Sequence, residues 1–402
     1  MPLHLLCVSR FFKGVDFLRA VRAEGHHVYL LTSAKLRDEP WPWDAIDETF
    51  FMDEDSQGRW NMDHVIDGIA YKMRSTRFDR FVSLDDFDVE NTARMREHFR
   101  VPGMGQTTAR YFRDKLAMRI RAREAGIPVP AFTPLFNDAE IAAFTATVPP
   151  PWLIKPRSSA SARGIKKLHS VQELWDEVHR LGDERHRFLV ERFAPGDVYH
   201  VDALSVGGEV VFVRANQYLD TPFDVAHGGG IFRSCSVAQG SPDDVALRQL
   251  NADVLRAFGM QYSASHTEFI RGREDGRYYF LETSSRVGGA NIAEMVEAAS
   301  GVNLWAEWAR IEIAMAEGKP YSLPPVRDDY AGIIVSLSRY EYPDLGGFAD
   351  PEVVWRMHKA WHLGLIVQSP DRDRVLALLD AYTQCTRAHF HASLPPEGVN
   401  QG

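Results

Sequence analysis

The sequence predicts a multidomain protein that combines α/β and α+β architecture. The chain has 402 residues, which is more than one ordinary hydrophobic core accommodates. Strand and helix patterns alternate near the N-terminus, which indicates a parallel sheet covered by helices. Farther along the chain, neighbouring strands are joined by short polar turns, which indicates antiparallel pairing.

The N-terminal region carries the alternating pattern. Predicted strands cover residues 3–8, 28–31 and 78–84, and predicted helices cover 14–24 and 62–75. The turn after the first strand, residues 9–14, lacks the glycine fingerprint of dinucleotide-binding proteins. We therefore predict a Rossmann-like domain over residues 1–105 that has no dinucleotide site.

The central part of the chain mixes helices with closely spaced strands. Predicted helices cover residues 114–125, 171–180, 243–258, 290–299 and 302–316, and predicted strands cover 152–155, 188–191, 198–206 and 210–213. Two segments predict loops: the small-residue run 157–164, and residues 223–230, which we expect to be flexible.

The C-terminal part of the chain shows a change of pattern. Predicted strands at 330–337 and 364–368 are followed by a predicted helix at 371–389. This arrangement predicts a small α+β domain over residues 325–402.

The most informative local pattern is a hairpin that carries one acid on each strand. Glu268 and Glu282 are flanked by apolar residues, and Gly272 and Gly276 mark the turn between the strands. Two carboxylates on adjacent strands repel unless a cation lies between them, and such oxygen ligands suit Mg²⁺. Arg286, four residues after the second acid, adds a fork of donors that fits phosphate or carboxylate oxygens. Metal, phosphate and arginine together indicate phosphoryl chemistry.

Composition and charge narrow the possible partners. The formal net charge of −9 argues against nucleic acid or an anionic membrane as the main partner. No apolar run approaches the ~18 residues of a membrane helix, and the run at the N-terminus is too short for a secretory signal. Cys7, Cys235 and Cys385 are far apart, and we expect reduced thiols that serve in packing. These features predict a cytoplasmic protein that acts on small molecules.

Six charged residues occur in a suggestive order around the loop 157–164. They are Lys115, Lys155, Glu191, Glu268, Glu282 and Arg286. In this order they resemble the ATP-grasp superfamily of carboxylate–amine ligases, and in particular the group of L-amino acid ligases and biotin carboxylases. The resemblance runs from about residue 100 to 320. Segments 337–340 and 362–369 resemble, more weakly, the C-terminal piece of amino-acid ligases.

The resemblance implies both a fold and an activity. The expected core has two α+β lobes, a small lobe over 106–190 and a large lobe with the metal site over 191–324. The expected cofactors are ATP and Mg²⁺, with Mn²⁺ able to substitute. The expected activity is an ADP-forming ligation of a carboxylate to an amine through an acyl phosphate, with amino acids or acids derived from them as substrates. A homodimer is common among such ligases.

The resemblance also assigns roles to single residues. Nucleotide binding falls to Lys115, Lys155, Ser159, Ser161, Gly164, Glu191, Arg192, Phe193 and Asp197; metal binding to Glu268, Glu282 and Ser284; catalysis to Arg286 and Lys155; and substrate binding to His266, Arg233, Gly288 and Gly289. The family usually has asparagine where this chain has Ser284, and a hydroxyl is the weaker magnesium ligand. The family also often has glutamate two residues after the linker glycine, whereas Asp197 follows Gly196 directly.

Other interpretations of these residues stay open at this point. Glu191 could be an exposed hinge acid, His266 a core histidine and Arg233 a surface residue. His200 and Asp202 alternate along one predicted strand and could face the same cleft. A bicarbonate-activating carboxylase and a non-catalytic ATP-binding module are the alternative functions.

Overall fold

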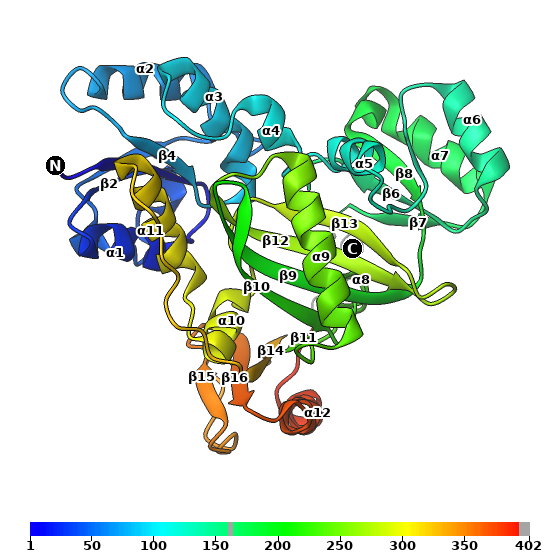
Figure 1. Cartoon of the computed structure of the whole chain (residues 1–402). Coiled ribbons are helices and arrows are strands. Elements are labelled where there is room, and N and C mark those ends of the chain that lie inside the picture. The colour runs from blue at the N-terminus through cyan, green and yellow to red at the C-terminus, as the bar shows by residue number, and fades with distance from the viewer. Residues whose placement is uncertain (160–163, 394–402) are drawn as a thin grey trace.

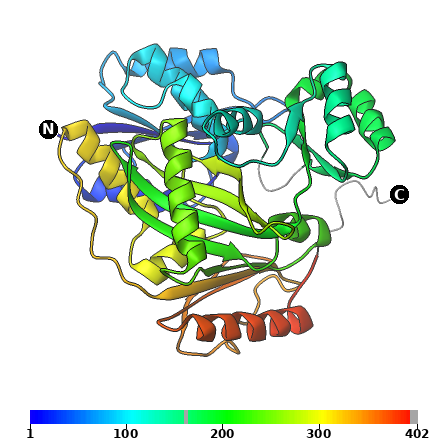
Figure 2. The ribbon, with the colours of Figure 1, turned by 45° about the vertical axis from the view of Figure 1, so that its right-hand side comes forward.

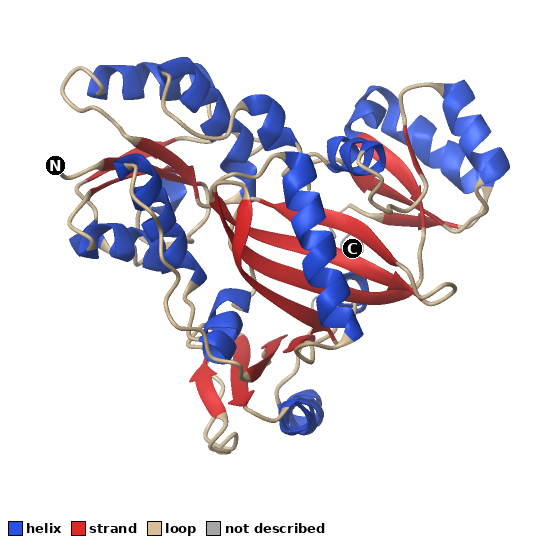
Figure 3. Ribbon diagram, in the orientation of Figure 1, coloured by secondary structure: helices blue, strands red, loops and turns tan. Residues whose placement is uncertain are grey.

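The computed structural model describes residues 1–159 and 164–393 and has mixed α/β and α+β architecture (Figure 1). Within these residues the strands form three sheets, of four, eight and four strands. The eight-stranded sheet occupies the middle of the molecule, and the other two sheets lie on opposite sides of it (Figure 3). The fold class predicted from the sequence is confirmed.

The N-terminal region is a parallel sheet with helices packed on it. Its elements are β1 (His4–Ser9), α1 (Val15–Ala23), β2 (His27–Ser33), β3 (Glu48–Met52), α2 (Met62–Lys72), β4 (Arg80–Ser83) and α3 (Val89–Phe99). The strand order is β3-β2-β1-β4, and all pairs are parallel, as in Rossmann-like sheets. The sequence pattern did not reveal β3 or α3, because β3 is only half buried and α3 is rich in charged residues.

A small lobe follows the short helix α4 (Gln106–Arg110). Its elements are α5 (Lys115–Glu124), β5 (Phe132–Pro134), α6 (Asp138–Thr147), β6 (Trp152–Pro156), β7 (Lys166–Leu168), α7 (Val171–Leu181) and β8 (Phe188–Arg192), and its antiparallel sheet has the order β5-β8-β6-β7. Side chains alternate along β6. Trp152 and Ile154 pack into the core with α6 and α7, whereas Leu153 and Lys155 face the opposite side. The lobe therefore presents one face of its sheet to the rest of the protein.

The large sheet supplies the other side of the molecule's main cavity. Its strands are β9 (Gly196–Val206), β10 (Glu209–Tyr218), β11 (Phe232–Ser236), β12 (Ser263–Gly272), β13 (Tyr278–Ser284), β14 (Tyr330–Leu337), β15 (Val353–Arg356) and β16 (His362–Ser369). The associated helices are α8 (Pro222–Gly228), α9 (Pro242–Phe258), α10 (Ile292–Ser300), α11 (Leu304–Glu317) and α12 (Arg372–His389). Helix α9 lies across β9 and β10 (Figure 1). Helix α11 packs against α1 of the N-terminal region, where the Phe17 and Trp308 rings lie 5.2 Å apart.

The C-terminal strands continue the large sheet, which runs in the order β13-β12-β9-β10-β11-β14-β16-β15. Helix α12 covers β14 and β16, below the sheet in the view of Figure 2. The predicted strands and helix of this part are therefore present, and they share a sheet with the residues before them. The domain boundaries at 105, 190 and 324 stay predictions.

One predicted loop is wrong. Residues 223–230 were expected to be flexible, but most of them belong to α8. Thr221 caps this helix, since its Oγ1 accepts a hydrogen bond from the Asp224 backbone N–H at 3.1 Å, and Pro222 occupies the first turn. The run of glycines at 228–230 outweighed these two start signals in the sequence pattern.

The helices of the described ranges include none that is long and apolar enough to cross a membrane.

Gly332 tests the packing of α12 on the sheet. A Cβ added at Gly332 would lie 2.5 Å from Leu379 Cδ1 and 2.9 Å from Val375 Cγ1, so Gly332→Ala must displace the helix or its side chains. We expect a loss of about 1–3 kcal/mol in the free energy of unfolding, measured in urea. The matched change Gly347→Ala meets no atom within 4 Å and should leave stability nearly unchanged. Equal stability of the two variants would contradict the packing described here.

Candidate active site

A cavity of about 670 Å³ lies where the small lobe, the large sheet and the N-terminal region meet. Most residues predicted for the site line it. They are Lys115, Lys155, Ser159, Glu191, Arg192, Phe193, His266, Glu268, Glu282, Ser284, Arg286 and Gly289. The fold thus gathers into one space residues that the sequence placed on separate elements.

Two acidic residues face each other across neighbouring strands of the large sheet. Glu268 on β12 and Glu282 on β13 are directly opposite in the antiparallel register, and a bulge follows Glu268. The Tyr218 hydroxyl donates to Glu268 Oε1 at 2.8 Å, and Lys115 forms an ion pair with Glu282 Oε2. Within the described residues, these polar contacts engage one oxygen of each carboxylate, Oε1 of Glu268 and Oε2 of Glu282. This donor set fits Mg²⁺, which binds one or two carboxylates together with phosphate and water, and Ser284 lines the same cavity.

A buried charge cluster joins the small lobe to the large sheet. Glu191 on β8 is 1% exposed, forms an ion pair with Lys155 of β6, and accepts a hydrogen bond from Arg119 Nε at 3.1 Å. Burial alone would raise the pKa of the Glu191 carboxyl, but the adjacent Arg119 and Lys155 charges lower it. Arg119 also donates to the backbone carbonyl of Leu281, beside Glu282. The interpretation of Glu191 as an exposed hinge acid is therefore wrong.

Lys115 links three parts of the cavity wall. It is the first residue of α5, where the Asp114 side chain caps the helix by accepting from the Leu116 N–H at 3.0 Å. Its ammonium group pairs with Glu282 and also donates to the Ser159 carbonyl at 2.8 Å. Lys115 therefore holds the start of the small-residue loop against the acidic hairpin.

Arg286 meets a residue that the sequence did not single out. Its guanidinium pairs with Asp86 of the N-terminal region and donates from NH1 to the Val287 carbonyl at 2.6 Å. Asp86 follows the carboxyl end of β4, where ligands of open α/β sheets commonly bind. In the sequence, the acidic run at 85–88 was the feature that could have indicated a functional role for Asp86. Arg119 was missed as well, although it lies one helical turn after Lys115.

Two histidines and an aspartate form a buried cluster beside the acidic hairpin. His200, Asp202 and His266 carry metal-type donors close to one another. His200 Nδ1 lies 2.7 Å and His266 Nδ1 lies 2.8 Å from the two oxygens of Asp202, and His200 Nε2 lies 2.7 Å from Ser234 Oγ. These are hydrogen-bond distances, and they engage both carboxylate oxygens. We therefore interpret the cluster as a hydrogen-bonded network.

The network sets the position of His266 at the cavity wall. His266 Nε2 lies 3.3 Å from the Tyr218 hydroxyl and 3.6 Å from Glu268 Oε1. Burial alone would lower the pKa of His266, but Asp202 and Glu268 raise it to about 10. Gly288 packs behind this network, since a Cβ there would lie 2.9 Å from His266 Nδ1. His266, Tyr218 and Glu268 line the cavity.

Four other predicted residues are not among those that line the cavity. Arg233 pairs with Asp220 at 2.8 Å and Asp380 at 3.0 Å, and Asp197 lies 3.5 Å from Arg273. Gly164 and Gly288 are likewise not among the lining residues. Ser161 lies outside the described residues. The assigned roles of all the predicted residues stay predictions.

Comparisons with known proteins find similar ligases. No protein-family model matches the chain. An L-arginine-specific L-amino acid ligase of Bacillus subtilis is 26% identical over 242 residues, which are 59% of this chain and 58% of that protein. A D-alanine–D-alanine ligase of Neisseria gonorrhoeae is 23% identical over 207 residues, or 50% of this chain and 66% of the ligase. The chain thus spans less than two thirds of the length of these relatives.

Solved structures match along almost the whole chain. The L-amino acid ligase of Bacillus licheniformis superposes with a TM-score of 0.73 at 17% identity, covering 98% of this chain and 99% of that one. The biotin carboxylase of Campylobacter jejuni superposes with a TM-score of 0.69 at 15% identity, covering 94% and 90%. The chain therefore has the ATP-grasp fold and is related to the ATP-grasp ligases.

Proposed function

We propose that the protein is an ATP-dependent, ADP-forming ligase that joins the carboxylate of one substrate to the amine of another. The observation that carries the proposal is the convergence in one cavity of the facing carboxylates Glu268 and Glu282 with Lys115, Lys155 and Arg286. ATP brings several negative charges, so its site must supply cations and aimed donors.

The proposed reaction has two steps, phosphoryl transfer and amide formation. A carboxylate oxygen of the first substrate attacks the γ-phosphorus of ATP, ADP leaves, and an acyl phosphate forms. The amine of the second substrate then attacks the acyl carbon, phosphate leaves, and the nitrogen loses a proton to give the amide. Bound Mg²⁺ would neutralise phosphate oxygens between Glu268 and Glu282.

In this reaction the side chains of the protein bind and orient the reacting groups and shield them from water. Lys115 and Lys155 hold the phosphates, and Arg286 offsets the negative charge that spreads over the transferring group. Ser159, in the small-residue run 157–164, lines the same cavity, and a site shielded from water would spare the acyl phosphate from hydrolysis. Glu191, buried between Arg119 and Lys155, fixes the position of Lys155.

Amino acids are the proposed substrate class. The support is the sequence similarity to an L-arginine-specific L-amino acid ligase and to D-alanine–D-alanine ligases. The bicarbonate alternative rests on biotin carboxylases that are 15–16% identical, a level that speaks for the fold alone. A cytoplasmic location and a homodimer, both expected from the sequence and the resemblance, stay predictions.

Phosphate release tests the activity directly. With ATP, Mg²⁺ and pooled amino acids, we expect phosphate release that depends on a pair of amino acids, and a product mass equal to their sum minus water. Glu282→Gln should lower this turnover by about 100-fold or more while ATP still binds, because a metal carboxylate is lost. Unchanged turnover in this variant would contradict the metal assignment. Release that requires bicarbonate instead of an amine would favour a carboxylase.

The pair between Lys115 and Glu282 generates a second prediction. Nucleotide binding must exchange this pair for contacts of Lys115 with phosphate and of Glu282 with the metal. Lys115→Met should therefore weaken ATP binding by about 10-fold or more, because a charge-assisted contact is lost. The same change should leave the affinity for Mn²⁺ alone equal or higher, because a competing cation is removed from Glu282.

Calorimetry for ATP and electron paramagnetic resonance for Mn²⁺ measure the two affinities separately. Lys72→Met is the matched control, since Lys72 pairs with Glu48 in the N-terminal region and does not line the cavity. A parallel loss of both affinities in Lys115→Met would show that the exchange does not occur.

A further inference from the structure

The ion pair between Asp86 and Arg286 joins the N-terminal region to the large sheet. The two residues are 200 positions apart in the sequence, and their side chains are 7% and 11% exposed. Both line the main cavity, next to the acidic hairpin. The N-terminal region, which has no dinucleotide fingerprint, thus places one carboxylate in contact with the arginine proposed to act on phosphate.

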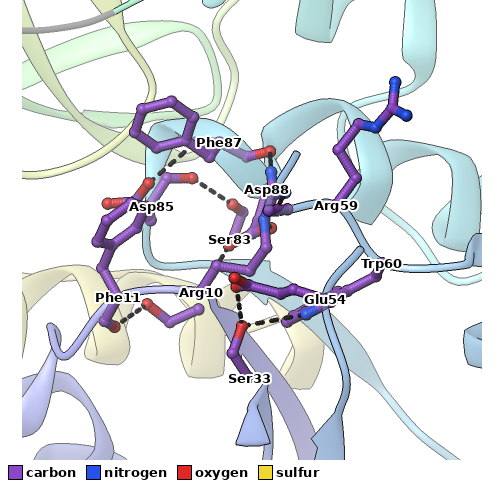
Figure 4. Close-up of polar contacts among 12 residues, drawn as sticks. Arg10, Phe11, Ser33, Glu54, Arg59, Trp60, Ser83, Asp85, Phe87 and Asp88 are labelled. Carbon is purple, nitrogen blue, oxygen red and sulfur yellow. Dashed lines mark hydrogen bonds and ion pairs between the residues drawn. The ribbon is translucent and has the colours of Figure 1, made fainter. Parts of the chain in front are cut away.

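The turn that carries Asp86 is held on several sides (Figure 4). Asp85 Oδ1 accepts a hydrogen bond from the Phe87 N–H at 3.0 Å, and Ser83 Oγ donates to the Asp85 carbonyl at 2.7 Å. Arg10, at the end of β1, donates to Asp88 from its backbone N–H at 2.8 Å and from Nε at 2.7 Å. These contacts tie residues 83–88 to the edge of the parallel sheet, so Asp86 is carried by a rigid turn.

The N-terminal region is itself fixed, by contacts away from the cavity, against helix α11, which packs on β9 and β12 of the large sheet. Arg80 of β4 and Glu312 of α11 are both buried, and Arg80 Nε lies 2.7 Å from Glu312 Oε2. Asn303 Nδ2 donates to Asp16 Oδ2 at 3.0 Å. Because a buried pair of this kind is costly to break, the turn keeps its place relative to β13.

The guanidinium of Arg286 is held at two of its nitrogens. NH2 pairs with Asp86 and NH1 donates to the Val287 carbonyl, whereas Nε has no hydrogen-bond partner within the described part of the chain. Burial would raise the pKa of Asp86, but Arg286 and Arg113 lower it to about 2, so the carboxylate stays charged. Without such contacts an arginine side chain samples many rotamers.

We propose that Asp86 is a positioning residue that holds the guanidinium of Arg286 in the orientation required for phosphoryl transfer. The inference rests on the proposed function, and it adds a role for the N-terminal region in the chemical step. Asp86 acts through Arg286, and the rigid turn at 83–88 supplies the precision. A misplacement of about 1 Å at a reacting centre can cost about 100-fold in rate, which sets the expected size of the effect.

The test is the variant Asp86→Asn, which keeps the shape of the side chain and removes its charge. We expect kcat to fall about 10- to 100-fold, with the KM for ATP and the calorimetric affinity for ATP changed less than about threefold. Asp86→Glu should recover part of the loss, because it restores the charge. The matched control is Asp63→Asn, which breaks an exposed pair with Arg94 at 2.9 Å and should keep wild-type kinetics.

A double-mutant cycle with Arg286→Lys isolates the coupling. If Asp86 acts through Arg286, the double variant should be about as slow as Arg286→Lys alone, whereas independent effects would multiply. Wild-type kcat in Asp86→Asn, or multiplicative losses in the cycle, would overturn the inference. A loss of kcat that accompanies an equal loss of ATP affinity and a lower unfolding temperature would also overturn it. Absence of turnover in the wild-type protein with every substrate pool would count against the proposed function itself.

Discussion

Four positive side chains converge in the main cavity, and each is held by a carboxylate. Lys155 and Arg119 share Glu191, Lys115 pairs with Glu282, and Arg286 pairs with Asp86. Charges removed from water are costly unless they are paired, so this pairing lets the folded protein keep these four cations at the cavity. Two of these pairs also join different parts of the fold. Glu282 lies on β13 of the large sheet and Arg286 lies just after it, whereas Lys115 belongs to α5 and Asp86 to the N-terminal region.

The sheets place these pairs by strand alternation and register. On β6, alternate side chains face the small-lobe core and the cavity, which brings Lys155 to the cavity side. On β12 and β13, the antiparallel register puts Glu268 opposite Glu282. Behind them, Asp202 forms hydrogen bonds with His200 on its own strand and with His266 on the neighbouring strand. These hydrogen bonds allow the three polar side chains to be buried on the sheet. The chemistry proposed for the cavity therefore depends on ordinary sheet geometry.

The sequence predicted those features that are coded locally. The acidic hairpin, the strand that carries Lys155 and the helix that starts at Lys115 each depend on a short pattern, and all three are present. Asp86 could not be predicted as the partner of Arg286, because their contact depends on how two distant regions pack. The burial of Glu191 was missed for the same reason: its two cationic partners come from other elements. Helix α8 was missed because the nearby glycines suggested a loop.

The central claim is that the cations paired within the protein are the ones that receive the phosphates of ATP. A crystal structure with Mg²⁺ and a non-hydrolysable ATP analogue tests it most directly. The account predicts Lys115 Nζ within hydrogen-bond distance of a phosphate oxygen and Glu282 coordinating the metal at about 2.0–2.1 Å. A nucleotide bound while Lys115 remains paired with Glu282, or bound outside this cavity, would contradict it.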